Sequence, residues 1–163
     1  MNILIADDEQ DIRNLVKISL RDLIKVLQDK DEKKAYALLK EIRVKSAASE
    51  NYYSYLDDFA GLLNAKNSYV RTRGFILCCA QARWDEKGKL QNVLPNMLTL
   101  LDDDKPTVVR QCLAALHEVV LFRLELCEPI KTELETIDLS KYKDSMSPLI
   151  KKDIDELLKM IDE

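Results

Sequence analysis

Apolar residues recur along most of the chain at spacings of three and four, the pattern of amphipathic helices. Residues 9–28 show it first, with Ile12, Leu15 and Val16 on one face. Polar runs interrupt the pattern, and each is followed by a new stretch of helical spacing. The spacing predicts helices over the ranges 9–28, 32–44, 52–63, 69–83, 90–101, 107–120, 129–137 and 148–161, with a polar linker over 139–147.

Two of the predicted helices begin at residues with a clear local role. Ser68 precedes the helix 69–83, and its hydroxyl can accept a hydrogen bond from a free amide of the first turn, so we expect it to be the N-cap. Pro106 follows three aspartates and a lysine. Proline suits the first position of a helix because the amide it lacks has no partner there.

A sequence repeat links two of the predicted helices. Leu62-Leu63 and Leu100-Leu101 each end a helix, and each is followed by a polar turn and a helix that opens on Val-Arg. Val70-Arg71 and Val109-Arg110 are 39 residues apart. At the same offset, Leu77 aligns with Leu116, and Ala80 aligns with Val119.

A fainter copy of the repeat lies earlier in the chain. Lys33, Leu39 and Ile42 precede Arg71, Leu77 and Ala80 by 38 residues. A helical hairpin that recurs at this period is the signature of HEAT or armadillo repeats. One hairpin cannot bury its apolar face alone, so neighbouring hairpins stack to form the core. We therefore predict an all-α fold, a right-handed α-α solenoid of HEAT-like hairpins over 21–163 with a C-terminal capping helix.

The chain from Leu23 to the C-terminus resembles a family of small bacterial HEAT-repeat proteins of unassigned function. The segments that resemble it are 67–74, 82–86, Lys105-Pro106 with Arg110-Gln111, and 141–154. Members are sometimes labelled SufBD-like, a name that implies iron–sulfur assembly, but the cysteines of this chain lack cluster spacing. The resemblance implies the fold and no established activity.

The first 20 residues resemble the opening of a response-regulator receiver domain. That resemblance makes Asp7 and Asp8 an acidic pair for Mg²⁺ and implies phosphoryl transfer. The rest of the receiver pattern is missing, because Asp57 and Asp58 follow a helical pattern instead of a strand. We expect 1–20 to be an extension that joins the first helix. Residues 1–7 should be loose, be absorbed into that helix, or pair with another chain by self-association.

Composition supports a single helical domain. The chain has 163 residues, of which 47% are apolar and 33% charged, with only 3 Gly and 4 Pro for tight turns. The net charge of −4 argues against a general nucleic-acid binder. No apolar run reaches the length of a membrane span and no signal peptide is visible, so we expect a cytoplasmic protein without a membrane partner.

The titratable residues offer little catalytic chemistry. The four cysteines have no Cys-x-x-Cys spacing, and we expect Cys78, Cys79 and Cys112 to be buried core thiols. A metal or redox role for these cysteines with His117, the one histidine, is the alternative. No nucleophile motif or phosphate loop is present. The prediction is a protein that is not an enzyme and binds no cofactor or metal.

Basic and aromatic residues recur at equivalent positions of the repeats and suggest a binding surface. In stacked hairpins such positions line up along one face. The predicted partner-binding residues are Tyr69, Arg71, Arg73, Trp84, Lys105 and Arg110. The alternative is that the Val-Arg arginines pair with carboxylates of neighbouring turns, such as Asp102 to Asp104.

These observations favour a non-enzymatic scaffold or adaptor that binds another protein of unknown identity. One alternative is a nucleic-acid-binding HEAT protein related to the glycosylases of alkylated bases, which Trp84-Asp85 suggests. The other is a phosphorylation-linked signalling module that uses Asp7 and Asp8.

Overall fold

The structure is a computed structural model, and it describes residues 21–163. The receiver-like opening, with Asp7 and Asp8, lies outside these residues, and so does the predicted self-association through residues 1–7.

Every regular element between residues 21 and 163 is helical, which confirms the predicted all-α class. A helical segment covers residues 21–27. The α-helices that follow are α2 (Glu32–Ala48), α3 (Leu56–Gly61), α4 (Ser68–Ala80), α5 (Leu90–Leu98), α6 (Pro106–Phe122), α7 (Cys127–Thr136) and α8 (Ser147–Asp162). Short 3₁₀ turns lie between them: η1 (Tyr53–Tyr55), η2 (Leu62–Asn64), η3 (Ala82–Trp84), η4 (Thr99–Asp102), η5 (Leu124–Leu126) and η6 (Leu139–Lys141). No helix in this part of the chain is both long and apolar enough to cross a membrane.

The helix ends differ from the sequence prediction at several places. Helix α2 continues four residues beyond Val44, because Ser46 is buried and its hydroxyl accepts a hydrogen bond from Gln81. The predicted helix 52–63 is divided into η1, α3 and η2. Pro106 begins α6 as predicted. The prediction for Ser68 was wrong: Asn67 is the N-cap of α4, and its side chain accepts from the amide of Tyr69.

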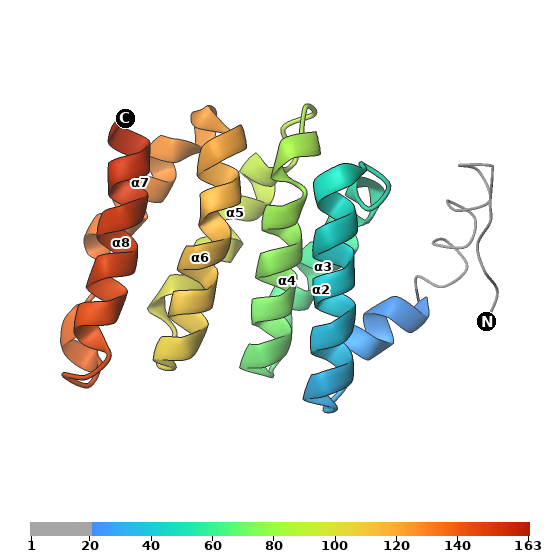
Figure 1. Ribbon diagram of the computed structural model, residues 1–163, viewed down its shortest axis with the longest axis horizontal. Coiled ribbons are helices and arrows are strands. Elements are labelled where there is room, and N and C mark those ends of the chain that lie inside the picture. The colour runs from blue at the N-terminus through green and yellow to red at the C-terminus, as the bar shows by residue number, and fades with distance from the viewer. Residues whose placement is uncertain (1–20) are drawn as a thin grey trace.

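The helices lie in two layers (Figure 1). Helices α2, α4, α6 and α8 stand side by side in the front layer in chain order, and α3, α5 and α7 lie behind them. Each front helix packs on the next: α2 on α4, α4 on α6, and α6 on α8. Helix α8 therefore ends the row on the side away from α2.

Helix α4 is the most completely buried helix of the row. Eleven of its 13 residues are buried, and the two others are Tyr69 and Arg71. A helix can be buried around most of its circumference only where neighbours cover it from several sides. Helices α2, α3 and α6 all pack against α4 and cover it. Cys78 and Cys79 belong to this helix and Cys112 to α6, and all three are buried free thiols as predicted.

Gly74 allows α4 to approach the preceding hairpin. A Cβ atom at this position would lie 2.7 Å from the Cβ of Leu62 and 2.8 Å from the carbonyl oxygen of Phe59. Neither atom can move without its backbone. The absent side chain at Gly74 therefore sets how closely α4 packs on α3 and η2.

We predict that Gly74→Ala destabilises the protein by about 1–3 kcal/mol, because the added methyl overpacks the contact with Phe59 and Leu62. Urea unfolding followed by circular dichroism measures the change. Gly61→Ala is the matched control: Gly61 is also helical, and a Cβ there has nothing within 4 Å. This control should gain about 0.5–1 kcal/mol. Equal effects of the two substitutions would contradict the packing argument.

We predict that a thiol reagent labels no cysteine of the folded protein at mildly alkaline pH and labels all four after unfolding. Burial raises the pKa of the Cys78, Cys79 and Cys112 thiols, so the reactive thiolate does not form. Desolvation also raises the pKa of Cys127. Counting the labelled thiols with and without denaturant checks this, and rapid labelling of the folded chain would show that a thiol is open to solvent.

Candidate partner-binding surface

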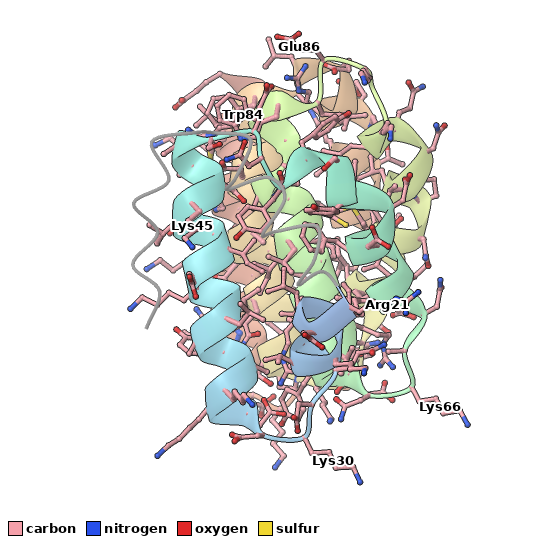
Figure 2. The ribbon with its side chains drawn as sticks, turned by 90° about the vertical axis from the view of Figure 1, so that its right-hand side faces the viewer. Arg21, Lys30, Lys45, Lys66, Trp84 and Glu86 are labelled. Carbon is pink, nitrogen blue, oxygen red and sulfur yellow. The ribbon has the colours of Figure 1, made fainter. Side chains whose placement is uncertain are left out.

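The six predicted binding residues do not lie on one surface. Five of them, all except Trp84, belong to the first two turns of α4 and α6 or to the loop just before α6. Trp84 follows the C-terminal end of α4, a helix of 13 residues that is about 20 Å long. Figure 2 shows Trp84 at one end of the molecule, and Lys66, from the loop before α4, at the other.

Arg71 connects two neighbouring turns. Its guanidinium donates to the carbonyl oxygens of Ala65 and Lys66, 2.9 and 2.7 Å away, in the turn before its own helix. It also pairs with Asp103 at 3.2 Å, in the turn before α6. The expected pairing of a Val-Arg arginine with the aspartates 102–104 is therefore confirmed for Arg71.

Arg73 lies in the interior, with 4% of its surface exposed. It donates to the carbonyl oxygen of Leu27 at 2.7 Å and pairs with Glu32 at 2.8 Å. A buried guanidinium needs such partners because its charge is costly to desolvate. The side chain thus joins α4 to the chain entering α2 and to the first turn of α2.

Arg110 and Lys105 are also held by their own chain. Arg110 pairs with Asp153 of α8, with its Nε 2.6 Å from a carboxylate oxygen. Lys105 donates to the hydroxyl of Ser68 at 2.9 Å, and its ammonium lies 4.7 Å from the centre of the Tyr69 ring. Tyr69 itself is 44% exposed. Tyr69 is the one aromatic residue of the five at this end.

Arginines hold the hairpins together at the other end of the molecule as well. Arg83 donates to the carbonyl oxygen of Ala47 at 2.6 Å and pairs with Glu118 of α6. Arg123, 40 residues later, donates to the carbonyl oxygens of Ala82 and Arg83. The last carbonyls of a helix lack amide partners, so these guanidinium groups stabilise the ends of α2 and η3.

Trp84 and Asp85 have structural partners. The indole of Trp84 donates to the carbonyl oxygen of Ser46 at 2.7 Å. Asp85 is buried and accepts from the backbone amides of Lys89 and Leu90 and from the hydroxyl of Tyr53. This aspartate, which suggested the glycosylase comparison, therefore fixes the loop that leads into α5.

A groove runs along α4 in the front layer, with α2 as one wall and α6 as the other. Two adjoining hollows of about 330 and 360 Å³ form it, and they share Arg43, Ile76 and Ala115. Buried side chains of α4 make the floor, among them Ile76. Tyr36 and Val44 on the α2 wall are 65% and 64% exposed. The groove thus presents apolar side chains to solvent.

The α2 wall of the groove is basic. Helix α2 carries five cations and two carboxylates, in a chain whose net charge is −4. Lys40 and Arg43 line the groove, and neither forms an ion pair with any residue from 21 to 163. The two carboxylates that line the groove already form ion pairs within the protein, Glu32 with Arg73 and Glu118 with Arg83. The charge left over in the groove is positive.

Sequence reasoning identified only Tyr69 and Arg73 among the residues of this groove. The missed residues on α2 are Tyr36, Lys40, Arg43 and Val44. Their spacing of four, seven and eight residues places them on one helical face, next to the buried face of Ala35, Leu39 and Ile42. This second stripe along α2, which contains Tyr36 and Val44, was the sequence signal from which the groove wall could have been predicted.

The described residues contain no preformed metal site. No three His, Cys, Asp or Glu side chains of residues 21–163 lie together so that they could hold an ion. All four cysteines pack in the apolar core, and burial raises the pKa of each, which keeps them as thiols.

We predict that Arg73→Met destabilises the fold by about 2–4 kcal/mol, because it leaves the carbonyl of Leu27 without its donor and removes the pair with Glu32. Methionine keeps most of the apolar stem. Arg43→Met is the control and should change stability by less than about 0.5 kcal/mol, since this side chain is exposed. Thermal unfolding of both variants is the measurement, and a mild effect at Arg73 would show that the interior contact is dispensable.

Comparison with known proteins assigns no family to this chain. No family of known proteins, no curated protein and no solved structure matches it. The resemblance to small bacterial HEAT-repeat proteins therefore remains an expectation from the repeat and the segments around it. A function is therefore inferred from the shape and charge of the molecular surface.

Proposed function

We propose that the protein is a non-enzymatic scaffold, built as a right-handed HEAT-like solenoid, that binds a segment of another protein in the groove between α2 and α6. The supporting observation is the groove itself: a floor on α4 that includes Ile76, beside a wall with two cations, Lys40 and Arg43, that form no ion pair within residues 21–163. The 38- to 39-residue repeat and the two helix layers support the solenoid.

The chemistry of the groove defines the segment that fits it. Exposed aromatic and aliphatic side chains such as Tyr36 and Val44 gain free energy when a partner covers them. Unpaired cations at the rim favour carboxylates and steer their approach. The partner segment should therefore combine apolar side chains with aspartate or glutamate. Since Arg71, Arg73 and Arg110 already have carboxylate partners, this surface and not those arginines is the proposed contact.

We predict that Arg43→Glu weakens partner binding about tenfold, because it replaces an attraction to the partner's carboxylates with a repulsion of similar size. Lys34→Glu is the matched control: it makes the same charge change on the same helix, on the face turned away from the groove. Both side chains are exposed, so both variants should fold.

The experiment uses the full chain as immobilised bait in lysate, with and without nuclease treatment. A photoreactive phenylalanine analogue at Tyr36 marks whatever lies in the groove. The expected result is a cross-linked peptide rich in apolar and acidic residues, retained by the wild type and by Lys34→Glu and lost with Arg43→Glu. Cross-linking that all variants share, binding abolished by nuclease, or a basic cross-linked peptide would overturn the proposal.

A further inference from the structure

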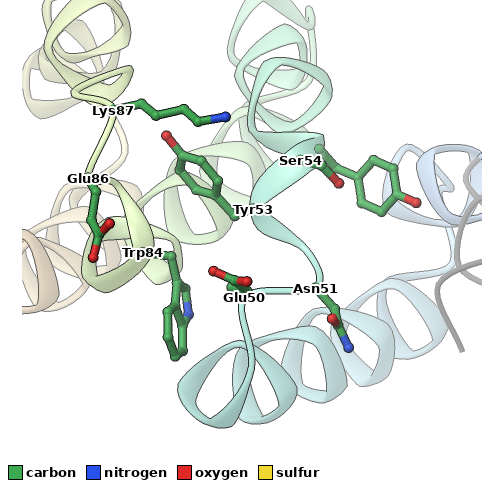
Figure 3. Close-up of a pocket in the computed structure, with 8 residues that line it drawn as sticks. Glu50, Asn51, Tyr53, Ser54, Trp84, Glu86 and Lys87 are labelled. Atoms are coloured by element: carbon green, nitrogen blue, oxygen red, sulfur yellow. The ribbon is translucent and has the colours of Figure 1, made fainter. Parts of the chain in front are cut away.

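A second hollow lies at the end of the molecule where α2 and α4 finish. Two loops far apart in the sequence, 50–55 and 84–87, enclose a volume of about 420 Å³, which is within the range of pockets that hold small ligands. Figure 3 shows the rings of Tyr53 and Trp84 in this pocket, with the carboxylate of Glu50 between them. None of its lining residues belongs to the groove along α4.

The two aromatic rings are fixed by hydrogen bonds at their polar atoms. The hydroxyl of Tyr53 donates to Asp85 at 2.5 Å, and the indole nitrogen of Trp84 donates to the carbonyl of Ser46 at 2.7 Å. Desolvation and the neighbouring Asp85 raise the pKa of Tyr53, so its ring stays an uncharged phenol. Because the Tyr53 hydroxyl and the Trp84 indole nitrogen already have hydrogen-bond partners, a ligand would contact the faces of the two rings.

Cations of this protein lie over aromatic rings at three other places. Arg83 lies 4.6 Å from the ring centre of Phe122, Lys105 4.7 Å from that of Tyr69, and Lys141 5.4 Å from that of Tyr142. Within residues 21–163, no cation occupies such a position over Tyr53 or Trp84.

Of the three charged residues that line the pocket, two are carboxylates. Glu50 and Glu86 line the pocket and are exposed, and neither forms an ion pair within the described part of the chain. Lys87 is the one cation of the lining, and it too is exposed and makes no ion pair there. Figure 3 shows the Lys87 side chain running past the hydroxyl end of Tyr53. The pocket thus has aromatic faces and a surplus of carboxylate, and both attract a positive group.

We propose that this pocket binds an organic cation, a quaternary ammonium or a guanidinium group, against Tyr53 and Trp84 with Glu50 and Glu86 as its counter-charges. Such a cation is attracted by the negative ring faces and loses less hydration than a bare ammonium or metal ion. The source is either a free small molecule or a side chain of a partner protein, since both present the same chemistry. This site does not depend on the proposed groove, whose unpaired charges have the opposite sign.

Trp84 makes a direct test simple, because it is the only tryptophan of the chain. Its fluorescence is titrated with choline and, separately, with the neutral 3,3-dimethylbutan-1-ol, which has the same shape without the charge. Choline should change the Trp84 fluorescence in a saturable way, with an affinity that is lower at higher salt, and the alcohol should leave the fluorescence unchanged. Proton NMR of the choline methyl groups is the second readout, and binding against the rings should shift them upfield. Peptides with arginine or trimethyl-lysine, compared with choline at equal concentration, distinguish the two sources.

The carboxylates are tested by Glu50→Gln and Glu86→Gln, which remove charge and keep the shape. Each should weaken choline binding about threefold, as expected for an exposed ion pair. Glu128→Gln, an exposed carboxylate on α7, is the control and should bind as the wild type does. Equal responses to choline and the alcohol, unshifted methyl signals, or wild-type affinity in both pocket variants would overturn the proposal.

Discussion

The burial of α4 on almost every side is the constraint on which the rest of the structure depends. From Gly74 to Ala80 this helix has no polar side chain except the two buried thiols, so helices before and after it must cover it. Helices α2, α3 and α6 do so. The hairpins therefore stabilise each other, and neither the groove nor the pocket belongs to one hairpin alone.

Arginines complete this arrangement at the two ends of the helices. Arg71 and Arg73 bind the turns at one end, and Arg83 and Arg123 bind helix carbonyls at the other. Packing of apolar side chains tolerates sliding of one helix along another. Hydrogen bonds from a planar guanidinium to particular carbonyls do not, so these contacts define the offset between hairpins.

Much of this could be predicted from the sequence, and the remainder depends on contacts between distant residues. Periodicity located the helices, and the repeat led to the pairing of Arg71 with Asp103. Arg73 was placed on the surface because its main acceptor, the carbonyl of Leu27, is a backbone atom and leaves no trace in the side-chain pattern. Asn67 caps α4 although Ser68 has the same capping chemistry, because the helix already begins at Ser68 and the Asn67 side chain accepts from the amide of Tyr69. The pocket between 50–55 and 84–87 was missed because only the folded chain brings these loops together.

Gly74 also bears on how such a chain could be redesigned or extended. The repeat that aligns Val70-Arg71 with Val109-Arg110 places Gly74 opposite Leu113, and Arg73 opposite Cys112. Leu113 and Cys112 fill the core of their own hairpin, whereas glycine at the equivalent place makes room for the backbone of Phe59. Averaging the copies into a consensus unit would put leucine where no side chain fits. The copies share a helical arrangement but have diverged at their contacts, so the hairpin that contains Gly74 cannot be replaced by its neighbour without a clash.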